Sequence, residues 1–119
     1  MSSAQIPVTV TTASGRITGV RRDGLHYFHS VRYSTIPSPY SPAEPLDGAF
    51  DQDAREPRPN DIALSITAPA DAAECPVVVY IHGGRFEHGS HEDPRLSGEK
   101  NARHGVIQVN VGYRVGLAG

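Results

Sequence analysis

The feature that most constrains this chain of 119 residues is an apolar run that ends in a pair of glycines. Residues 77–81 read Val-Val-Val-Tyr-Ile, and the sequence His-Gly-Gly follows directly at 82–84. An apolar run without alternation is typical of a strand covered on both faces, as in the parallel sheet of an α/β protein. Residues 106–111 predict a second buried strand, and residues 95–103 predict a short helix between the two. This order predicts one βαβ unit.

The N-terminal part predicts antiparallel strands. β-Branched residues at 6–20 flank a turn-like Ala-Ser-Gly sequence, which favours a β-hairpin. Residues 21–24 predict a second turn, and residues 25–33 predict a third short strand. Apolar and small or polar residues alternate over 62–68, which indicates a half-buried strand.

Six prolines between residues 36 and 60 disfavour regular structure and predict a long surface loop. A loop of this length is uncommon in a compact domain unless it is functional or packs on something else, so we expect much of it to lie against a larger body. The predicted fold class is α/β, with a β-hairpin, a mixed sheet and one βαβ unit in a single segment that spans 1–119.

Composition and charge limit the partners. Leu, Ile, Val and Phe together number 26, which predicts a core with few apolar residues. The net charge of −2, without a basic stripe, gives no reason to expect nucleic acid or an anionic membrane surface as a partner. The sequence has no run of eighteen apolar residues and no secretory start, and Cys75 is its single cysteine. We therefore expect a soluble protein in the cytoplasm.

The glycine pair has a possible chemical role. Glycines at the end of a strand let the backbone adopt conformations that a Cβ would forbid, and such a turn can point consecutive N–H groups into one cavity. These donors would stabilise the negative oxygen that forms when an acyl carbonyl is attacked, an effect of about 3–4 kcal/mol per donor. The alternative is that Gly83 and Gly84 form only a tight connection between strand and helix.

Five segments together resemble the N-terminal part of type-B carboxylesterases, which include para-nitrobenzyl esterases and cholinesterases. Their family patterns are an opening T-x-x-G-x-(I/V)-x-G hairpin, F-x-G-I-P-Y-A, D-C-L-x-L-N-(I/V)-x-x-P, an HGG-containing loop and N-Y-R-L-G. The matching segments are, in chain order, 12–19 (TASGRITG), 28–34 (FHSVRYS), 60–69 (NDIALSITAP), 81–90 (IHGGRFEHGS) and 110–116 (NVGYRVG). The resemblance implies an α/β-hydrolase fold, of which this chain is an incomplete, N-terminal portion.

The chain departs from these patterns at several positions. Ser30 and Arg32 replace the glycine and proline of G-I-P, and Ile62 replaces the cysteine of D-C-L. Two residues, at 111–112, separate the asparagine from the tyrosine of N-Y-R. Arg85 stands where the usual HGGG motif has its third glycine.

The resemblance implies an oxyanion-hole loop made by Gly83, Gly84 and Arg85. Any residue except proline supplies a backbone N–H, so Gly84 and Arg85 are expected to give two of the oxyanion donors. We expect Phe86, the next residue along the loop, to contact the substrate. The Arg85 side chain has two interpretations: it extends into solvent, or it places a cation near the acyl pocket and favours acidic esters.

The nucleophile of the family is not in this sequence. Type-B carboxylesterases carry a catalytic serine in a G-x-S-x-G elbow, and no such motif occurs among the 119 residues. Ser90 lies on the oxyanion loop itself and is not assigned as a nucleophile. We expect the chain to be inactive alone, with no cofactor, and to need the C-terminal part of the hydrolase to act on a small carboxylic ester. The alternative is a non-catalytic hydrolase-like module for protein interaction or self-association.

A group of histidines and acidic residues on the same loop could be mistaken for a metal site. Its members are His82, Glu87, His88, His91, Glu92 and Asp93. Their spacing does not match a zinc pattern such as H-E-x-x-H, and a glycine-rich loop holds ligands poorly. We therefore expect no metal and a solvated acidic loop. The resemblance implies that His82 packs under the oxyanion turn.

Overall fold

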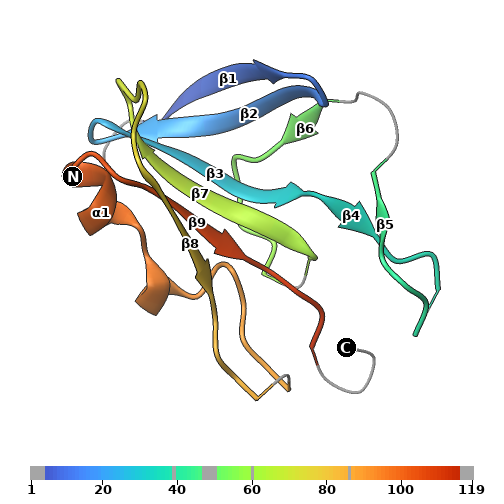
Figure 1. Cartoon of the computed structure of the whole chain (residues 1–119). Coiled ribbons are helices and arrows are strands. Elements are labelled where there is room, and N and C mark those ends of the chain that lie inside the picture. The colour runs from blue at the N-terminus through green and yellow to red at the C-terminus, as the bar shows by residue number, and fades with distance from the viewer. Residues whose placement is uncertain (1–4, 39, 47–50, 60, 86, 116–119) are drawn as a thin grey trace.

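The computed structural model describes residues 5–38, 40–46, 51–59, 61–85 and 87–115. Its elements, in chain order, are β1 (Ile6–Thr12), β2 (Gly15–Arg22), β3 (Leu25–Arg32), β4 (Ser34–Thr35), β5 (Glu44–Pro45), β6 (Gln52–Asp53), β7 (Ala63–Pro69), β8 (Val77–Ile81), the 3₁₀ helix η1 (Pro94–Leu96), α1 (Glu99–Arg103) and β9 (Ile107–Val111). Six of the strands form a mixed sheet in the order β1-β2-β3-β7-β9-β8, and β6 pairs with β2 beside this path. Figure 1 shows this sheet as one twisted layer, with α1 beside β7 and β9.

The two N-terminal hairpins follow from their turns. β1 pairs with β2 in antiparallel register around residues 13–14, as the sequence predicts. β2 and β3 are joined by Asp23 and Gly24, whose φ angles are 55° and 79°. Positive φ at both central residues is the requirement of a tight two-residue hairpin turn, and an Asp-Gly pair meets it. The turn predicted over 21–24 is confirmed at its last two residues, while Arg21 and Arg22 belong to β2.

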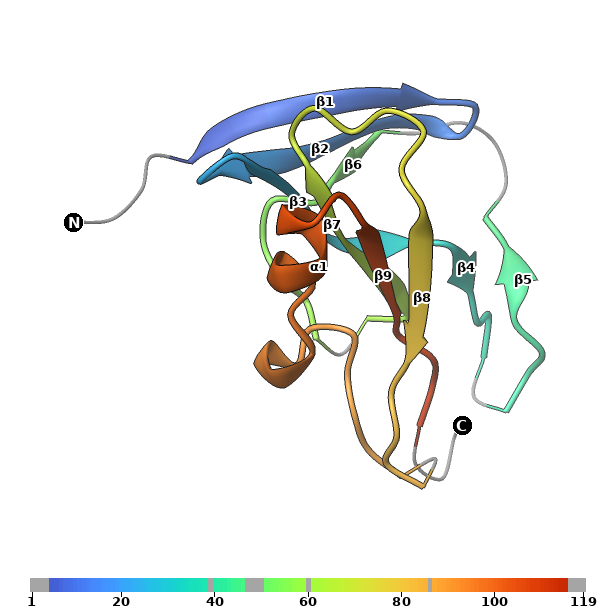
Figure 2. The same ribbon diagram turned by 60° about the vertical axis from the view of Figure 1, so that its left-hand side comes forward.

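The predicted βαβ unit is confirmed. β8 and β9 pair in parallel, and α1 connects them on one face of the sheet (Figure 2). The predicted helix over 95–103 is divided into η1 and α1, with residues 97–98 between them. β9 also pairs antiparallel with β7, so the parallel pair joins the hairpin strands in one sheet.

The core lies on both faces of β3. Val20, Leu25 and Tyr27 form one cluster with Ala102 of α1. Phe28, Val31 and Ala54 form a second cluster, supported by partly buried residues of neighbouring strands: Val8, Ile17, Leu64 and Ile66. The predicted long loop therefore has a packed part, because Ala54 is fully buried and its N–H donates to the carbonyl of Thr18.

The prediction that the strand at residues 77–81 is covered on both faces is wrong for this chain. All five residues of β8 are exposed, with Val79 at 58% and Ile81 at 68%. β8 is the last strand of the sheet, so only β9 pairs with it among the described residues. The helix α1 packs over β3, β7 and β9 instead. The apolar run thus forms the expected strand, but no described element buries its side chains.

Candidate functional site

The His-Gly-Gly-Arg turn begins directly after the C-terminal end of β8, at the lower end of the sheet in Figure 1. Gly84 has a φ of 138° and Arg85 a φ of 57°, so two consecutive residues have positive φ. The Gly84 carbonyl accepts hydrogen bonds from the N–H of Glu87 at 3.0 Å and from that of His88 at 3.3 Å. The chain therefore reverses its direction tightly at this point.

Position 84 requires glycine for two reasons: the His88 backbone approaches it closely, and its φ is positive. A Cβ at this position would lie 1.9 Å from the carbonyl oxygen of His88, whereas a Cβ at Gly83 would meet nothing within 4 Å. Arg85 has the left-handed conformation that glycine adopts at least cost, at a position where the family pattern has glycine. The backbone here has a glycine-like course although a side chain is present.

The predicted oxyanion residues surround one hollow. Gly83, Gly84 and Arg85 line it together with Ile81, His82 and Tyr113, and its volume is about 330 Å³. Within the described residues, no backbone or side-chain acceptor binds the N–H of Gly84 or of Arg85. No described acceptor therefore competes for these two donors. The predicted substrate contact, Phe86, lies outside the described residues.

His82 packs under the turn, as the family resemblance implies. It is 5% exposed, and its Nδ1 lies 2.8 Å from the carbonyl oxygen of Gly83, so Nδ1 carries the proton and donates. The ring stacks on Tyr113 with centroids 4.3 Å apart, and the Tyr113 hydroxyl donates to the His82 carbonyl. These contacts fix the start of the turn against the segment that follows β9.

A buried polar cluster, which the sequence does not predict, joins β3 to a later part of the same loop. It consists of His29, Ser30, His91 and Glu92. The Ser30 Oγ lies 3.0 Å from His91 Nε2 and 3.0 Å from Glu92 Oε2, and His29 Nδ1 lies 3.0 Å from Glu92 Oε1. Ser30 is fully buried and His91 is 2% exposed. The expected solvated loop is therefore wrong for His91 and Glu92, because their polar atoms are satisfied inside the protein.

The backbone explains how Ser30 reaches this cluster. Phe28 pairs with Ile66 and Val31 with Leu64, so β3 has one extra residue in its ladder with β7, which is a β-bulge. Ser30 lies in this bulge with a φ of 57°. The bulge interrupts the alternation of β3 and accommodates a buried hydroxyl between the strand and the loop.

The hydrogen bonds define the proton positions of the cluster. The Arg58 N–H donates to Ser30 Oγ at 2.7 Å, and the ionised Glu92 carboxylate at 3.0 Å is a stronger acceptor for the single hydroxyl proton than the neutral Arg58 carbonyl at 3.1 Å. Ser30 Oγ then accepts its second hydrogen bond from His91 Nε2–H. Burial raises the pKa of the Glu92 carboxyl, but the hydrogen bonds from His29 and Ser30 outweigh burial and hold this pKa below its usual value. Burial also lowers the pKa of His91.

Ser30, His91 and Glu92 do not form an acylation site. In a Ser-His-acid triad, the carboxylate binds the second nitrogen of the histidine, whereas Glu92 here binds the serine hydroxyl itself. Ser30 is also inaccessible to an ester, because none of its surface is exposed. The cluster instead ties the loop after the glycine turn to β3 and to Arg58.

Two classes of feature are absent from the described ranges. No group of three or more His, Cys, Asp or Glu side chains is arranged to hold a metal ion there. No helix in the same ranges has the length and apolar character needed to cross a membrane.

Comparison with known proteins gives consistent relatives. Residues 60–119 match the model of the carboxylesterase family. Para-nitrobenzyl esterase of Bacillus subtilis is 31% identical over 137 aligned positions, which cover 92% of this chain and 28% of the esterase. Phenmedipham hydrolase of Pseudarthrobacter oxydans is 27% identical over 95% of this chain and 29% of its own length.

Solved structures have the same fold. A carboxylesterase of Geobacillus stearothermophilus superimposes with a TM-score of 0.84 and 29% identity, covering 93% of this chain and 27% of that one. Juvenile hormone esterase of Manduca sexta gives a TM-score of 0.84 at 25% identity, over 96% of this chain and 28% of that one. The chain thus spans less than a third of the length of these relatives. With half of its residues matched by the family model, it belongs to the carboxylesterase family and corresponds to the N-terminal part of a type-B member.

Proposed function

We propose that this chain supplies the oxyanion-hole turn of a serine carboxylesterase that hydrolyses small carboxylic esters. The observation that carries the proposal is the turn at Gly84 and Arg85, two consecutive residues of positive φ after the end of a strand. Among the described residues, no acceptor binds their N–H groups. In the intact enzyme, a serine would attack the ester carbonyl, expel the alcohol and form an acyl-enzyme that water hydrolyses. The two N–H groups would bind the carbonyl oxygen as it becomes negative.

The exposure of Arg85 favours the interpretation that its side chain extends into solvent. Arg85 is exposed, and no described carboxylate or carbonyl accepts a hydrogen bond from its guanidinium. A role for this cation in selecting acidic esters therefore has no support from a contact. The donor that matters for the proposal is the backbone N–H.

A chimera tests the role of the turn. The corresponding segment of Bacillus subtilis para-nitrobenzyl esterase would be replaced by this chain, and kcat would be measured with p-nitrophenyl acetate. Arg85→Gly keeps the N–H and the positive φ, so the chimera should keep its activity. Arg85→Pro removes both and should lower kcat by about 100-fold to 1,000-fold. Equal activity of the two variants would overturn the proposal.

We also propose that the chain alone is inactive, because it has no G-x-S-x-G elbow. The purified chain should hydrolyse p-nitrophenyl acetate no faster than a buffer blank. Saturable turnover that an organophosphate abolishes would show that a nucleophile is present. The single cysteine, Cys75, is compatible with a cytoplasmic location, which cell fractionation would test.

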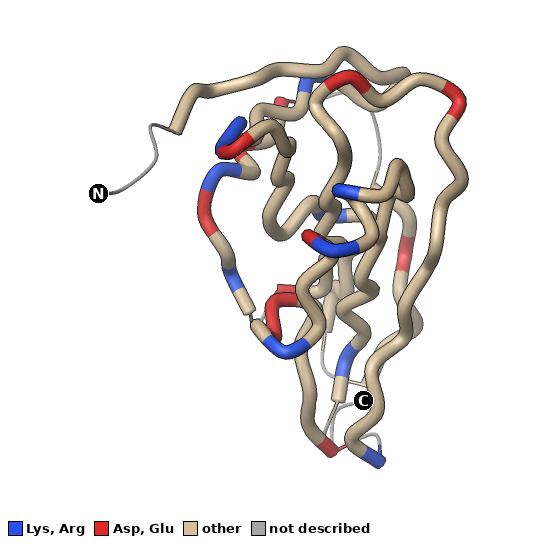
Figure 3. Tube along the Cα trace, turned by 90° about the vertical axis from the view of Figure 1, so that its left-hand side faces the viewer, with Lys and Arg blue, Asp and Glu red and all other residues tan. Residues whose placement is uncertain are grey.

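The exposed edge of β8 favours self-association as a second candidate function. Figure 3 shows residues 77–81 without charge along the trace, and no described strand pairs with the free edge of β8. Such an edge has none of the charges, prolines or bulges that usually prevent pairing with another chain. Sedimentation should show an oligomer that Val79→Lys dissociates. A chain that is monomeric before the substitution would exclude this candidate.

A further inference from the structure

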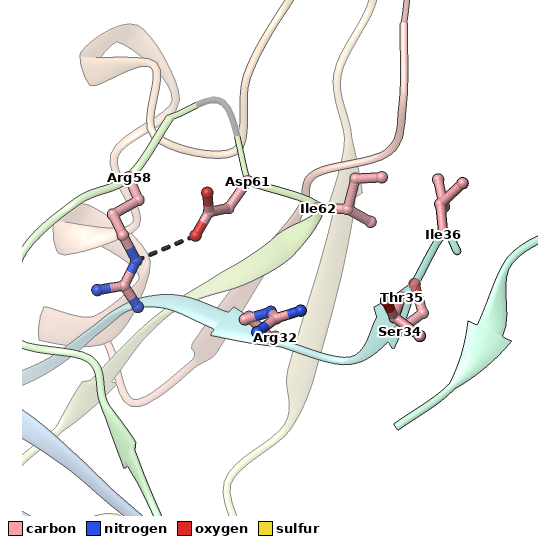
Figure 4. A pocket seen from close by; sticks show the side chains of 7 residues that line it. All are labelled: Arg32, Ser34, Thr35, Ile36, Arg58, Asp61 and Ile62. Carbon is pink, nitrogen blue, oxygen red and sulfur yellow. Dashed lines mark hydrogen bonds and ion pairs between the residues drawn. The ribbon is translucent and has the colours of Figure 1, made fainter. Parts of the chain in front are cut away.

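We infer that a hollow at the end of β3 binds a small monoanionic carboxylate through Arg32 and Arg58. The hollow has a volume of about 540 Å³, within the range of ordinary ligand sites. It is lined by Arg32, Ser34, Thr35, Ile36, Arg58, Asp61 and Ile62 (Figure 4). It is separate from the hollow at the glycine turn, because the two share no lining residue.

Arg58 is held in place before any ligand binds. Its Nε donates to Asp61 at 3.0 Å, and one terminal nitrogen donates to the carbonyl oxygens of Asp53 at 3.1 Å and Ser30 at 3.4 Å. No described residue accepts from its other terminal nitrogen. A guanidinium fixed in this way loses little conformational freedom when it binds a carboxylate.

Arg32 has a fixed backbone and a free side chain. Its N–H donates to the Gln52 side chain at 2.8 Å, and its carbonyl accepts from the same side chain at 3.2 Å. Its guanidinium binds no described residue. In Figure 4 this guanidinium lies between Arg58 on one side and Ser34 and Thr35 on the other. The family pattern has proline at this position, so the cation is a property of this chain.

Ser34 supplies an independent sign that a polar ligand belongs in the hollow. It is 9% exposed, and its hydroxyl has no hydrogen-bond partner within the described residues. A buried hydroxyl without a partner is destabilising, and most buried polar side chains in proteins are satisfied. The hydroxyl oxygen itself is closed off from solvent, so the Ser34 side chain would rotate toward the hollow for a carboxylate oxygen to accept its hydrogen bond.

Charge and shape select the ligand class. Arg32 and Arg58 bring two positive charges and Asp61 one negative charge, so the lining has a formal charge of +1. One carboxylate neutralises this charge, whereas a phosphate dianion exceeds it. The forked guanidinium also matches a planar carboxylate. Ile36 and Ile62 form an apolar wall, which favours an apolar group on the acid, as in benzoate.

Calorimetric titration of the purified chain with sodium benzoate tests the inference. Benzamide serves as the neutral ligand and inorganic phosphate as the dianion, at one ionic strength maintained with NaCl. We expect benzoate to bind at least tenfold more tightly than either. Absence of benzoate binding, equal binding of benzamide, or tighter binding of phosphate would overturn the assignment.

Substitutions at the hollow separate binding from folding. Arg32→Ala should weaken benzoate binding about tenfold or more, and Arg32→Lys should weaken it less. Arg21→Ala removes another exposed strand arginine and should leave binding unchanged. Ser34→Ala should weaken binding but leave the melting temperature equal or higher, because it deletes an unsatisfied hydroxyl. Circular dichroism would verify that each variant is folded, and equal affinities of the folded Arg32→Ala and Arg21→Ala variants would refute the site.

Discussion

Adding one methyl group at each of two adjacent glycines should have very different effects on stability. Gly84→Ala would place a Cβ 1.9 Å from the His88 carbonyl oxygen and 2.8 Å from its carbonyl carbon. It would also place alanine at a φ of 138°, which side chains rarely adopt. Gly83→Ala would add a Cβ with no atom within 4 Å. The two variants have the same composition, so only the local geometry distinguishes them.

The magnitudes follow from these two environments. Backbone strain of this kind costs about 1–3 kcal/mol, and the clash with backbone atoms adds to it unless the turn rearranges. We therefore expect Gly84→Ala to lower the free energy of unfolding by about 2–4 kcal/mol. Gly83→Ala should change it by no more than about 1 kcal/mol, and reduced freedom of the unfolded chain makes a small gain possible.

Urea unfolding followed by far-UV circular dichroism measures both values. The midpoint of Gly84→Ala should be well below that of the unsubstituted chain, and the midpoint of Gly83→Ala should be close to it. The slopes with urea should be similar, since the surface exposed on unfolding is unchanged. Equal destabilisation by both substitutions would refute the turn geometry on which the oxyanion proposal depends.

Two further predictions concern the buried cluster. Ser30→Ala should lower the free energy of unfolding by about 2–4 kcal/mol, because Glu92 Oε2 and His91 Nε2 lose their hydrogen bond while His29 still binds Glu92 Oε1. Ser30→Gly should lose about 1 kcal/mol less, since glycine tolerates the φ of 57°. His91 and Glu92 have lower pKa values in the folded state, so the unfolded chain binds more protons as the pH falls. Stability should therefore decrease below about pH 6.5 because of His91 and again below about pH 4.5 because of Glu92. Chemical denaturation between pH 7.5 and 4 would measure this dependence. His91→Gln should reduce the loss of stability below about pH 6.5, and His104→Gln, at an exposed histidine, is the control. Stability that rises as the pH falls would contradict the assignment.

The parts of the fold that the sequence predicts are those with local causes. The Asp23–Gly24 pair encodes a hairpin turn by itself, and the apolar runs at 77–81 and 106–111 encode two strands. Their parallel pairing follows because a helix connects them. The position of the glycine turn follows from its place directly after a strand.

The exposure of β8 could not be predicted in this way. An apolar run indicates the surroundings that its side chains favour, whereas their cover comes from other elements. Here α1 packs on β3, β7 and β9, and β8 has one strand neighbour among the described residues. Val77, Val79 and Ile81 therefore remain exposed although their sequence is that of a buried strand.

The buried cluster was missed for a different reason. Ser30 is 61 residues from His91, and no spacing rule connects them. A plain strand over 25–33 would also assign each side chain to a face by alternation, but the bulge at Ser30 breaks that alternation. The one available signal was the serine itself, which stands where the family pattern has glycine.

Ser30 and Arg85 together indicate what the family pattern requires at these two positions. Each replaces a glycine of the pattern, and each has a φ of 57°, so the backbone keeps a glycine-like conformation at an expected cost of about 1 kcal/mol per residue. The Ser30 hydroxyl offsets this cost through its hydrogen bonds, whereas the Arg85 side chain is exposed and has no described partner that would do so. Strain without a local gain persists only where the surrounding structure imposes it. At Arg85 the tight turn at Gly84 and the packed His82 together hold the backbone in this conformation. This supports a backbone N–H, and not a side chain, as the functional group of the turn.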